Sequence, residues 1–298
     1  MDLAVDEQLL VAAEESIPQT LEYFHLLEHP FLSGPDFRFL YTTDQVKDAI
    51  VSTLQHIFQG THPVYMYGEY GNGKTTIIMR LYALLTGDKN KRFQVKFVKA
   101  SEGITRNALI RDILSEFELK PARSHHQSLN KLQEYLLNQD EVQPILLIDE
   151  GQYIEDDVLS LLHSIFSIET AKRKGLYVVI VGQLPLAQHI LSRGELASRM
   201  KPIMISSMTA EELKQMLLFR WTVAGGKEED FPFKPDDYKS FEILATYTQG
   251  VPRDALKVAA DILTDLWRDD KRKISPQEVE QIASRNNLPL KQSSENIA

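Results

Sequence analysis

A glycine-rich stretch in the first third of the chain, GEYGNGKT over residues 68–75, constrains the fold more than any other feature. Its glycine, four residues and Gly-Lys-Thr fit the phosphate-binding loop pattern. The apolar residues 64–67 before it predict a short buried strand, and residues 76–85 after it predict a helix with one apolar face. This strand, loop and helix indicate a phosphate site rather than an incidental glycine turn.

The chemistry of such a loop follows from its backbone. Glycines let the chain curl so that its N–H groups point inward, and the next helix N-terminus adds partial positive charge. We expect Lys74 to contact the β- and γ-phosphates of ATP and the Thr75 hydroxyl to bind Mg²⁺. The residues expected to hold the phosphates are Gly68, Glu69, Tyr70, Gly71, Asn72, Gly73, Lys74, Thr75 and Thr76.

The hydrophobic pattern predicts an α/β fold followed by an all-helical part. Strands are expected at 64–67, 93–100, 142–148, 177–181 and 203–205, and helices between them include 104–117, 129–137 and 158–168. This alternation predicts a parallel sheet with helices on both faces. Beyond about residue 208 only helices are expected, at 210–221, 236–248, 253–267 and 276–284.

The expected domains follow from these shifts in pattern. They are an N-terminal helical arm (1–24), an α/β ATP-binding core (25–207), a C-terminal helical lid (208–285) and a flexible tail (286–298).

Two carboxylates follow the buried strand of residues 145–148. Parallel sheets bind ligands at the carboxyl ends of their strands, where Asp149 and Glu150 would emerge. We expect Asp149 to hold Mg²⁺, and Glu150 to orient and polarise the attacking water. Acidic residues often end strands, so this assignment depends on the phosphate loop upstream.

Two further polar residues are candidates for sensing the γ-phosphate. Gln183 follows the strand of residues 177–181, where it is either a sensor or an ordinary strand-end glutamine. Arg253 follows Pro252, which suits the first position of a helix. An arginine there opposes the helix dipole. A γ-phosphate would stabilise it, although a surface salt bridge or solvation are the alternatives.

Composition excludes several classes of protein. There is no cysteine, which excludes disulfides and thiolate catalysis. The net charge of −9 argues against a wholly basic nucleic-acid binder, yet permits a local basic surface. The apolar runs are too short to cross a bilayer. We expect a cytoplasmic protein without a membrane partner.

Short motifs along the chain resemble the AAA+ ATPases, and more narrowly the ExeA/TniB/TnsC-like group. The resemblance covers roughly residues 22–285 in order and spacing. It is carried by His29-Pro30-Phe31, Phe39-Leu40-Tyr41, the loop at 68–75, Leu147-Ile148-Asp149-Glu150-Gly151-Gln152, Glu169, Val181-Gly182-Gln183-Leu184-Pro185-Leu186, Arg199-Met200, Arg220 with Ala224-Gly225, and Gly250-Val251-Pro252-Arg253.

The resemblance implies roles for several of these residues. Gln183 takes the first sensor position, where asparagine or threonine is more usual, and Arg253 takes the second. Arg199 takes the arginine-finger position, with Arg193 as the alternative. The segment around Leu40 and Tyr41 would lie against the adenine.

The resemblance also implies an assembly. We expect a homo-oligomeric ring or filament that binds duplex DNA with ATP and presents it to a transposase. Basic loops at 89–92, Arg106 and 120–123 are candidates for phosphate contacts. ExeA carries a membrane segment and a further C-terminal region, and the expected lack of both favours the transposition regulators. The alternative is an ATPase coupled to a protein partner in secretion or defence, which the negative net charge favours. A non-hydrolysing scaffold is disfavoured by the full set of site residues.

Overall fold

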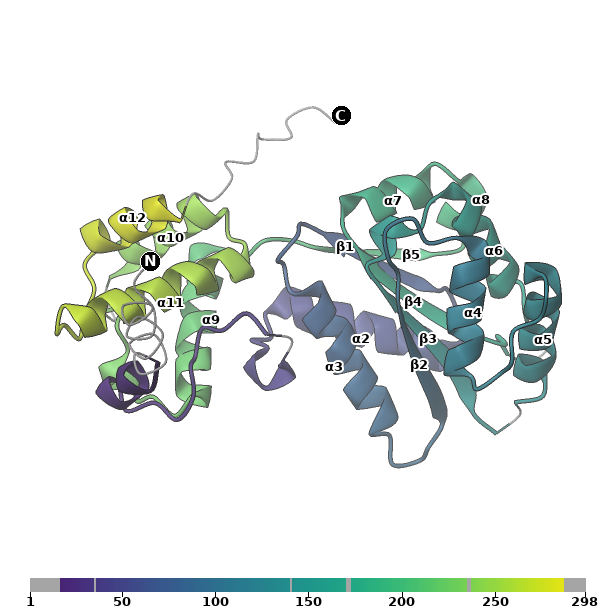
Figure 1. Ribbon diagram of the computed structural model, residues 1–298, viewed down its shortest axis with the longest axis horizontal. Coiled ribbons are helices and arrows are strands. Elements are labelled where there is room, and N and C mark those ends of the chain that lie inside the picture. Colours follow the sequence, from purple (N-terminus) through teal and green to yellow (C-terminus); the bar gives the residue numbers. More distant parts are fainter. Residues whose placement is uncertain (1–16, 35, 140, 170–172, 235–236, 287–298) are drawn as a thin grey trace, which may run out of the picture. The chain divides into compact units, whose positions relative to one another are not determined.

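The computed structural model describes residues 17–286, apart from residues 35, 140, 170–172 and 235–236. The chain divides into two compact units (Figure 1). One is Thr42–Ser206, called here the sheet unit. The other joins the residues up to Tyr41 with those from Ser207 onward, and is called here the helical unit.

The sheet unit is built on five parallel strands in the order β2-β3-β4-β1-β5. They are β1 (Val64–Gly68), β2 (Phe93–Lys99), β3 (Gln143–Asp149), β4 (Tyr177–Gly182) and β5 (Lys201–Ile205). This confirms the predicted parallel α/β sheet. The strand β4 lies between β3 and β1, so the residue that follows β4 stands between the carboxylates after β3 and the loop after β1.

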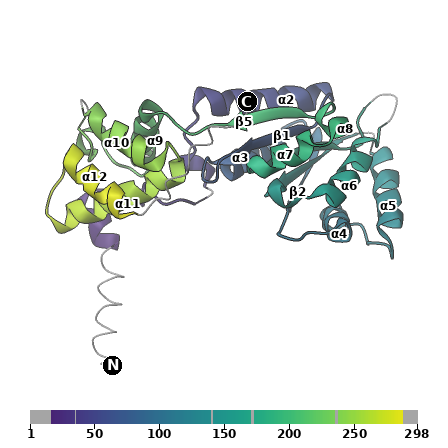
Figure 2. The ribbon, with the colours of Figure 1, turned by 90° about the horizontal axis from the view of Figure 1, so that it is seen from above.

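Helices cover both faces of this sheet, as predicted. The helices α2 (Asp44–Gln59) and α3 (Lys74–Thr86) lie on one face. The other face carries α4 (Arg106–Glu116), α6 (Asp156–Phe166) and α7 (Leu184–Leu191), with α5 (His125–Leu137) packed on α4 and α8 (Gly194–Ala197) on α7. Figure 2 shows α2 on one side of the sheet and α4 and α6 on the other.

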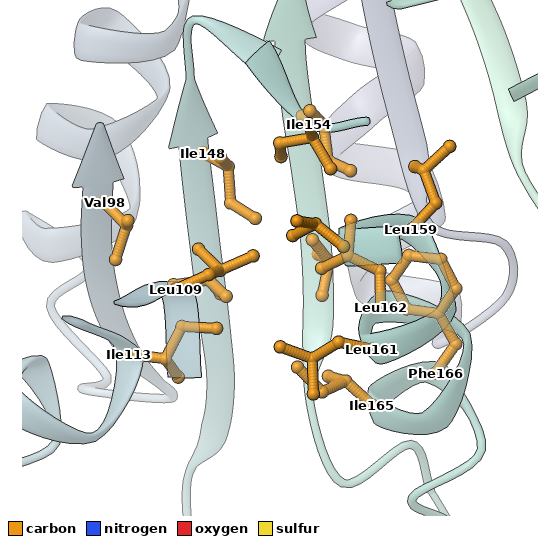
Figure 3. Close-up of a cluster of buried hydrophobic side chains, with 14 of the residues drawn as sticks. Val98, Leu109, Ile113, Ile148, Ile154, Leu159, Leu161, Leu162, Ile165 and Phe166 are labelled. Carbon is orange, nitrogen blue, oxygen red and sulfur yellow. The ribbon is translucent and has the colours of Figure 1, made fainter. Parts of the chain in front are cut away.

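The core under α4 and α6 fixes the strand that carries the predicted carboxylates (Figure 3). Ile148 of β3 lies with Leu109 of α4 and Leu162 of α6, and all three side chains are fully buried. Moving β3 would expose these side chains, each stabilised by about 1.5–3 kcal/mol through burial. The end of β3 is therefore held rigidly.

The helical unit confirms the predicted all-helical C-terminal part. Its main helices are α9 (Ala210–Val223), α10 (Tyr238–Thr248), α11 (Pro252–Arg268) and α12 (Pro276–Arg285), with short turns η1 (Phe37–Phe39) and η3 (Glu228–Asp230). Capping boxes begin α9 and α12, through Thr209 with Glu212 and Ser275 with Glu278. Each box satisfies two backbone N–H groups of the kind that a helix N-terminus leaves open.

The structure corrects one expected domain boundary. Residues 25–41 were expected in the core, but the described ones group with the helical unit. Leu26, Phe31 and Phe39 pack in the core of this unit, and buried Arg220 of α9 adds hydrogen bonds to the segment. Its guanidinium donates to the carbonyl oxygens of Pro30 at 2.8 Å, Leu32 at 2.6 Å and Phe39 at 3.0 Å. We therefore propose residue 42 as the start of the core.

The two predicted ends of the chain are largely outside the described residues. Of the expected N-terminal arm, only residues 17–24 are described, and 17–23 are helical. Of the expected tail, only Asn286 is described, as the C-cap of α12.

Replacing Arg220 by alanine is expected to destabilise the helical unit by about 3 kcal/mol or more. Burial lowers the pKa of Arg220 to about 10, which still leaves it charged at neutral pH. The substitution would leave three carbonyl oxygens without this donor, and each buried unsatisfied group costs about 1–3 kcal/mol. Urea unfolding followed by tryptophan fluorescence measures this directly, because both tryptophans, Trp221 and Trp267, lie in the helical unit.

The matched control is Arg268→Ala, which removes an exposed arginine from α11 of the same unit. Arg268 pairs with Asp265 at 3.5 Å. Exposed pairs contribute about 0–1 kcal/mol. If Arg220→Ala lowers the free energy of unfolding no more than this control does, Arg220 is not what holds the entry segment.

Candidate functional site

The glycine loop is anchored by close packing against β5. A Cβ atom on Gly68 would lie 2.1 Å from the carbonyl oxygen of Ile205, so only glycine fits there. The Asn72 side-chain amide donates to the same oxygen at 3.1 Å. Gly71 and Gly73 have φ of +88° and +80°, a region that glycine adopts readily. The sequence therefore fixes the curl that a phosphate cradle needs.

Lys74 begins α3 and its side chain is buried against the loop. Its ammonium donates to the carbonyl oxygens of Gly68 at 3.0 Å and Glu69 at 2.8 Å. These neutral acceptors satisfy N–H groups without cancelling the positive charge. The lysine is therefore placed at the cradle as a point charge suited to an anion.

The loop and the end of β3 meet through Thr75 and Asp149. The Thr75 hydroxyl donates to Asp149 Oδ2 at 3.0 Å, and the N–H of Glu150 donates to Asp149 Oδ1 at 2.8 Å. Burial raises the pKa of Asp149, while these two hydrogen bonds oppose the rise. A nearby cation would favour the ionised carboxylate.

This pair of oxygen ligands fits Mg²⁺. Mg²⁺ is usually held by one or two carboxylates together with substrate phosphates and water. Within the described part of the chain, no group of three or more His, Asp or Glu side chains could hold a metal. Thr75 and Asp149 therefore suit an ion that a bound nucleotide helps to coordinate.

Glu150 is held by contacts that the local sequence pattern does not reveal. Its backbone has φ of +56°, in the left-handed region. Gln152 Nε2 donates to Glu150 Oε2 at 2.5 Å, and Lys99 Nζ lies 4.0 Å from Glu150 Oε1. The N–H of Gln183 donates to Gln152 Oε1 at 3.1 Å. Lys99 could have been found from strand order, because it pairs in register with Asp149.

The candidate arginine finger Arg199 lies at the opposite end of β1 and β5 from this loop, within the sheet unit. Arg199 is exposed, and its carbonyl oxygen is 3.2 Å from His62 Nδ1, just before β1 and β5 begin. The phosphate loop follows the other end of β1. Five strand residues span about 16 Å. Arg193 is the N-cap residue of α8. The structure therefore does not bring Arg199 to the loop of its own chain.

Three of the predicted site residues, Leu40, Tyr41 and Arg253, belong to the helical unit. Leu40 is the C-cap residue of η1, and the Tyr41 ring lies 5.8 Å from that of Phe219. Arg253 stands in the first turn of α11, which begins at Pro252 as the sequence predicted. Their roles as nucleotide contacts stay predictions.

No helix in the described ranges combines the length and apolar character needed to cross a membrane.

Comparison with known proteins points to one family. Residues 55–191 match the family described as an AAA domain. General secretion pathway protein A of Aeromonas hydrophila is 26% identical over 240 residues, which cover 78% of this chain and 42% of that protein. The chain thus spans less than half the length of this curated relative.

Two solved structures share the fold. Cdc6p of Pyrobaculum aerophilum has a TM-score of 0.62 at 20% identity, over 84% of this chain and 70% of that one. The ORC1 protein of Aeropyrum pernix, solved in complex with DNA, has a TM-score of 0.58 at 17% identity, over 81% and 64%. Together with the phosphate loop, the strand order and the carboxylates after β3, these similarities show that the chain has an AAA+ P-loop fold and that its sequence is similar to General secretion pathway protein A.

Proposed function

We propose that this protein binds and hydrolyses ATP and that it works as a self-assembling switch. The observation that carries the proposal is the hydrogen-bonded series from Thr75 through Asp149 to Glu150, beside the buried Lys74. Phosphoryl transfer needs positioning and charge stabilisation more than covalent chemistry. These residues supply both from one edge of a rigid sheet.

Each residue has a distinct proposed role. The loop N–H groups and Lys74 bind the phosphates, and Thr75 with Asp149 would hold Mg²⁺, which neutralises phosphate charge when bound. Glu150 orients a water for attack and accepts its proton. Gln183 stands after β4, between Glu150 and the phosphate loop, which suits a sensor. Leu40 and Tyr41 are proposed to contact the base, and Arg253 the γ-phosphate.

The location of Arg199 supports assembly of several copies. An arginine at the amino end of β5 would serve a phosphate only in another copy, because its own loop lies beyond the opposite end of the strands. We propose that Arg199 completes a neighbour's site, so that hydrolysis depends on oligomer formation. Arg193 is the alternative.

We further propose that the assembly forms on duplex DNA in the cytoplasm and regulates a transposase. The DNA complex of the related ORC1 fold supports a DNA partner. Among the candidate contacts, Arg92 pairs with Asp88 at 2.8 Å and Arg106 with Asp157 at 3.2 Å. Exposed pairs of this kind are weak, so DNA phosphates could compete for both arginines.

A second function is favoured by a separate observation. The sequence similarity to General secretion pathway protein A, together with the net charge of −9, supports a protein partner in place of DNA. The same ATP chemistry would then drive a partner protein in secretion or defence.

The two functions differ in their dependence on salt. With ATP and Mg²⁺ at low salt, we expect the protein to form particles larger than a dimer and to retard a duplex of unrelated sequence. Affinity should fall steeply as salt rises, by about 0.9 log units per tenfold change in salt for each phosphate neutralised. Light scattering and gel shift measure these two properties.

A matched control is the same titration with ADP. Assembly with ATP but no shift of duplex DNA at any salt would support the protein-partner alternative. Equal assembly with ADP, or none with either nucleotide, would contradict the ATP switch.

A further inference from the structure

Gln152 bridges Glu150, which follows β3, and Gln183, which follows β4. It lies in η2 (Gly151–Tyr153), the turn that follows β3 and Glu150. Its amide nitrogen donates to Glu150 Oε2 at 2.5 Å and its amide oxygen accepts from the N–H of Gln183 at 3.1 Å. Because a carboxylate only accepts and a backbone N–H only donates, both partners fix one orientation of this amide.

The backbone around Gln152 leaves room for this bridge. A Cβ atom on Gly182 would lie 2.9 Å from the backbone nitrogen of Gln152 and 3.1 Å from its amide oxygen. A Cβ atom on Gly151 would lie 2.5 Å from Ile180 Cγ2. Two glycines therefore let the turn after β3 approach the end of β4 closely enough for one amide to span them.

A second group competes for the same carboxylate. Lys99 Nζ lies 4.0 Å from Glu150 Oε1, and the lysine side chain is 66% exposed. At this separation the two charges attract each other, while water and salt weaken the attraction. The neutral amide of Gln152 is the shorter and more directional contact. It sets which way Glu150 points while Lys99 remains able to move.

We propose that Gln152 is a positioning residue, which aims the Glu150 carboxylate toward the end of β4 and couples it to Gln183. The inference rests on the proposed function, in which Glu150 activates water. Removing the amide leaves Lys99 as the stronger partner, so Glu150 turns away from the position of the water. Turnover should then fall while nucleotide binding, which depends on the loop and Lys74, is unaffected.

Two variants test this. Gln152→Ala is expected to lower kcat about 10–100-fold, because a misplacement of about 1 Å can reduce a rate that much. Its ATP affinity should stay within about twofold of the parent's, since no phosphate contact is changed. Equilibrium binding of a fluorescent ATP analogue and steady-state hydrolysis give the two quantities.

Gln152→Glu keeps the shape of the side chain but replaces its N–H donor with a carboxylate. The introduced carboxylate repels Glu150 in place of holding it, because two carboxylates that both only accept cannot hydrogen-bond to each other. At pH 8, kcat should therefore fall at least as far as in Gln152→Ala, while ATP affinity stays within about twofold of the parent's. Gln133→Glu adds the same charge at an exposed site on α5 and should keep the parent's kcat.

The outcomes separate this inference from the function on which it rests. A parental kcat for Gln152→Ala, or a kcat for Gln152→Glu no lower than that of Gln133→Glu, overturns the positioning role. Loss of ATP affinity equal to the loss of kcat also overturns it, because Gln152 would then only support the loop. If Glu150→Gln leaves hydrolysis unchanged in the parent protein, the proposed function itself has failed. If Gln152→Ala does not fold, the kcat of the isosteric Gln152→Glu still tests the positioning role.

Discussion

Glu150→Gln is expected to bind ATP about as well as the parent and to hydrolyse it about 10²–10⁴ times more slowly. That range is typical of losing a positioned general base. The substituted amide has nearly the same shape, and its oxygen can still accept from Gln152, but it cannot take a proton. Lys74, Thr75 and Asp149, which are proposed to hold the nucleotide and Mg²⁺, are unchanged. Steady-state phosphate release and equilibrium binding of a fluorescent ATP analogue measure the two effects.

The same variant should also trap the assembly, because ATP is consumed so slowly. Light scattering after addition of ATP is expected to decay in the parent and to persist in Glu150→Gln. Glu141→Gln is the matched control, since Glu141 is exposed before β3 and away from the strand's carboxyl end. Hydrolysis at the parental rate would show that Glu150 is not the base. Loss of ATP binding would assign Glu150 a structural role instead.

The features that local chemistry determines were predictable from the sequence. The loop pattern places its own strand and helix, and β1 and α3 appear where residues 64–67 and 76–85 predicted them. The apolar run before Asp149 predicted β3 because four consecutive apolar side chains need burial on both faces of a sheet. The contact from Thr75 to Asp149 then follows from parallel strand order.

In the sheet unit, the start of one helix was predicted wrongly and two short helices were not predicted. The predicted start of the helix at residue 129 was wrong, because α5 begins at His125 with Ser124 as its N-cap. The residues that follow Ser124 are polar, so the apolar periodicity used to predict the helix begins only at residue 129. The helices α7 and α8 were not predicted, although α7 carries a proline in its first turn. Their short length weakens any periodic pattern.

The entry segment and the Gln152 bridge could not be read from local pattern. The hydrogen bonds from Arg220 to Pro30, Leu32 and Phe39 join residues more than 180 positions apart. Neither stretch of sequence contains a pattern that indicates the other as its partner. Gln152 lies two residues from Glu150, so it was visible in the sequence. Its role depends on Gly182 and the N–H of Gln183, which only the pairing of β3 with β4 brings close.

Arg199→Ala is expected to lower ATP hydrolysis about 10³–10⁵-fold while ATP affinity is retained. An arginine finger raises kcat by about this factor in phosphoryl-transfer systems that use one. The position of Arg199 at the amino end of β5, beside His62, places it away from the phosphate loop of its own chain. Its loss therefore removes no contact within the proposed nucleotide site of the same copy, and only the neighbour's transition state loses charge stabilisation.

Mixing two defective proteins tests whether the finger acts between copies. Lys74→Ala is expected to lose its own phosphate binding but to keep Arg199, while Arg199→Ala keeps an intact loop. An interface that joins the intact loop to the intact arginine is complete, so mixtures should hydrolyse ATP faster than either variant alone. Arg193→Ala is the matched comparison, because it removes an arginine from the same segment between β4 and β5. Rescue with Arg193→Ala in place of Arg199→Ala would transfer the role to Arg193. If neither arginine variant is rescued by Lys74→Ala at any mixing ratio, a finger acting in trans is contradicted. Each copy would then supply all the residues that its own hydrolysis needs.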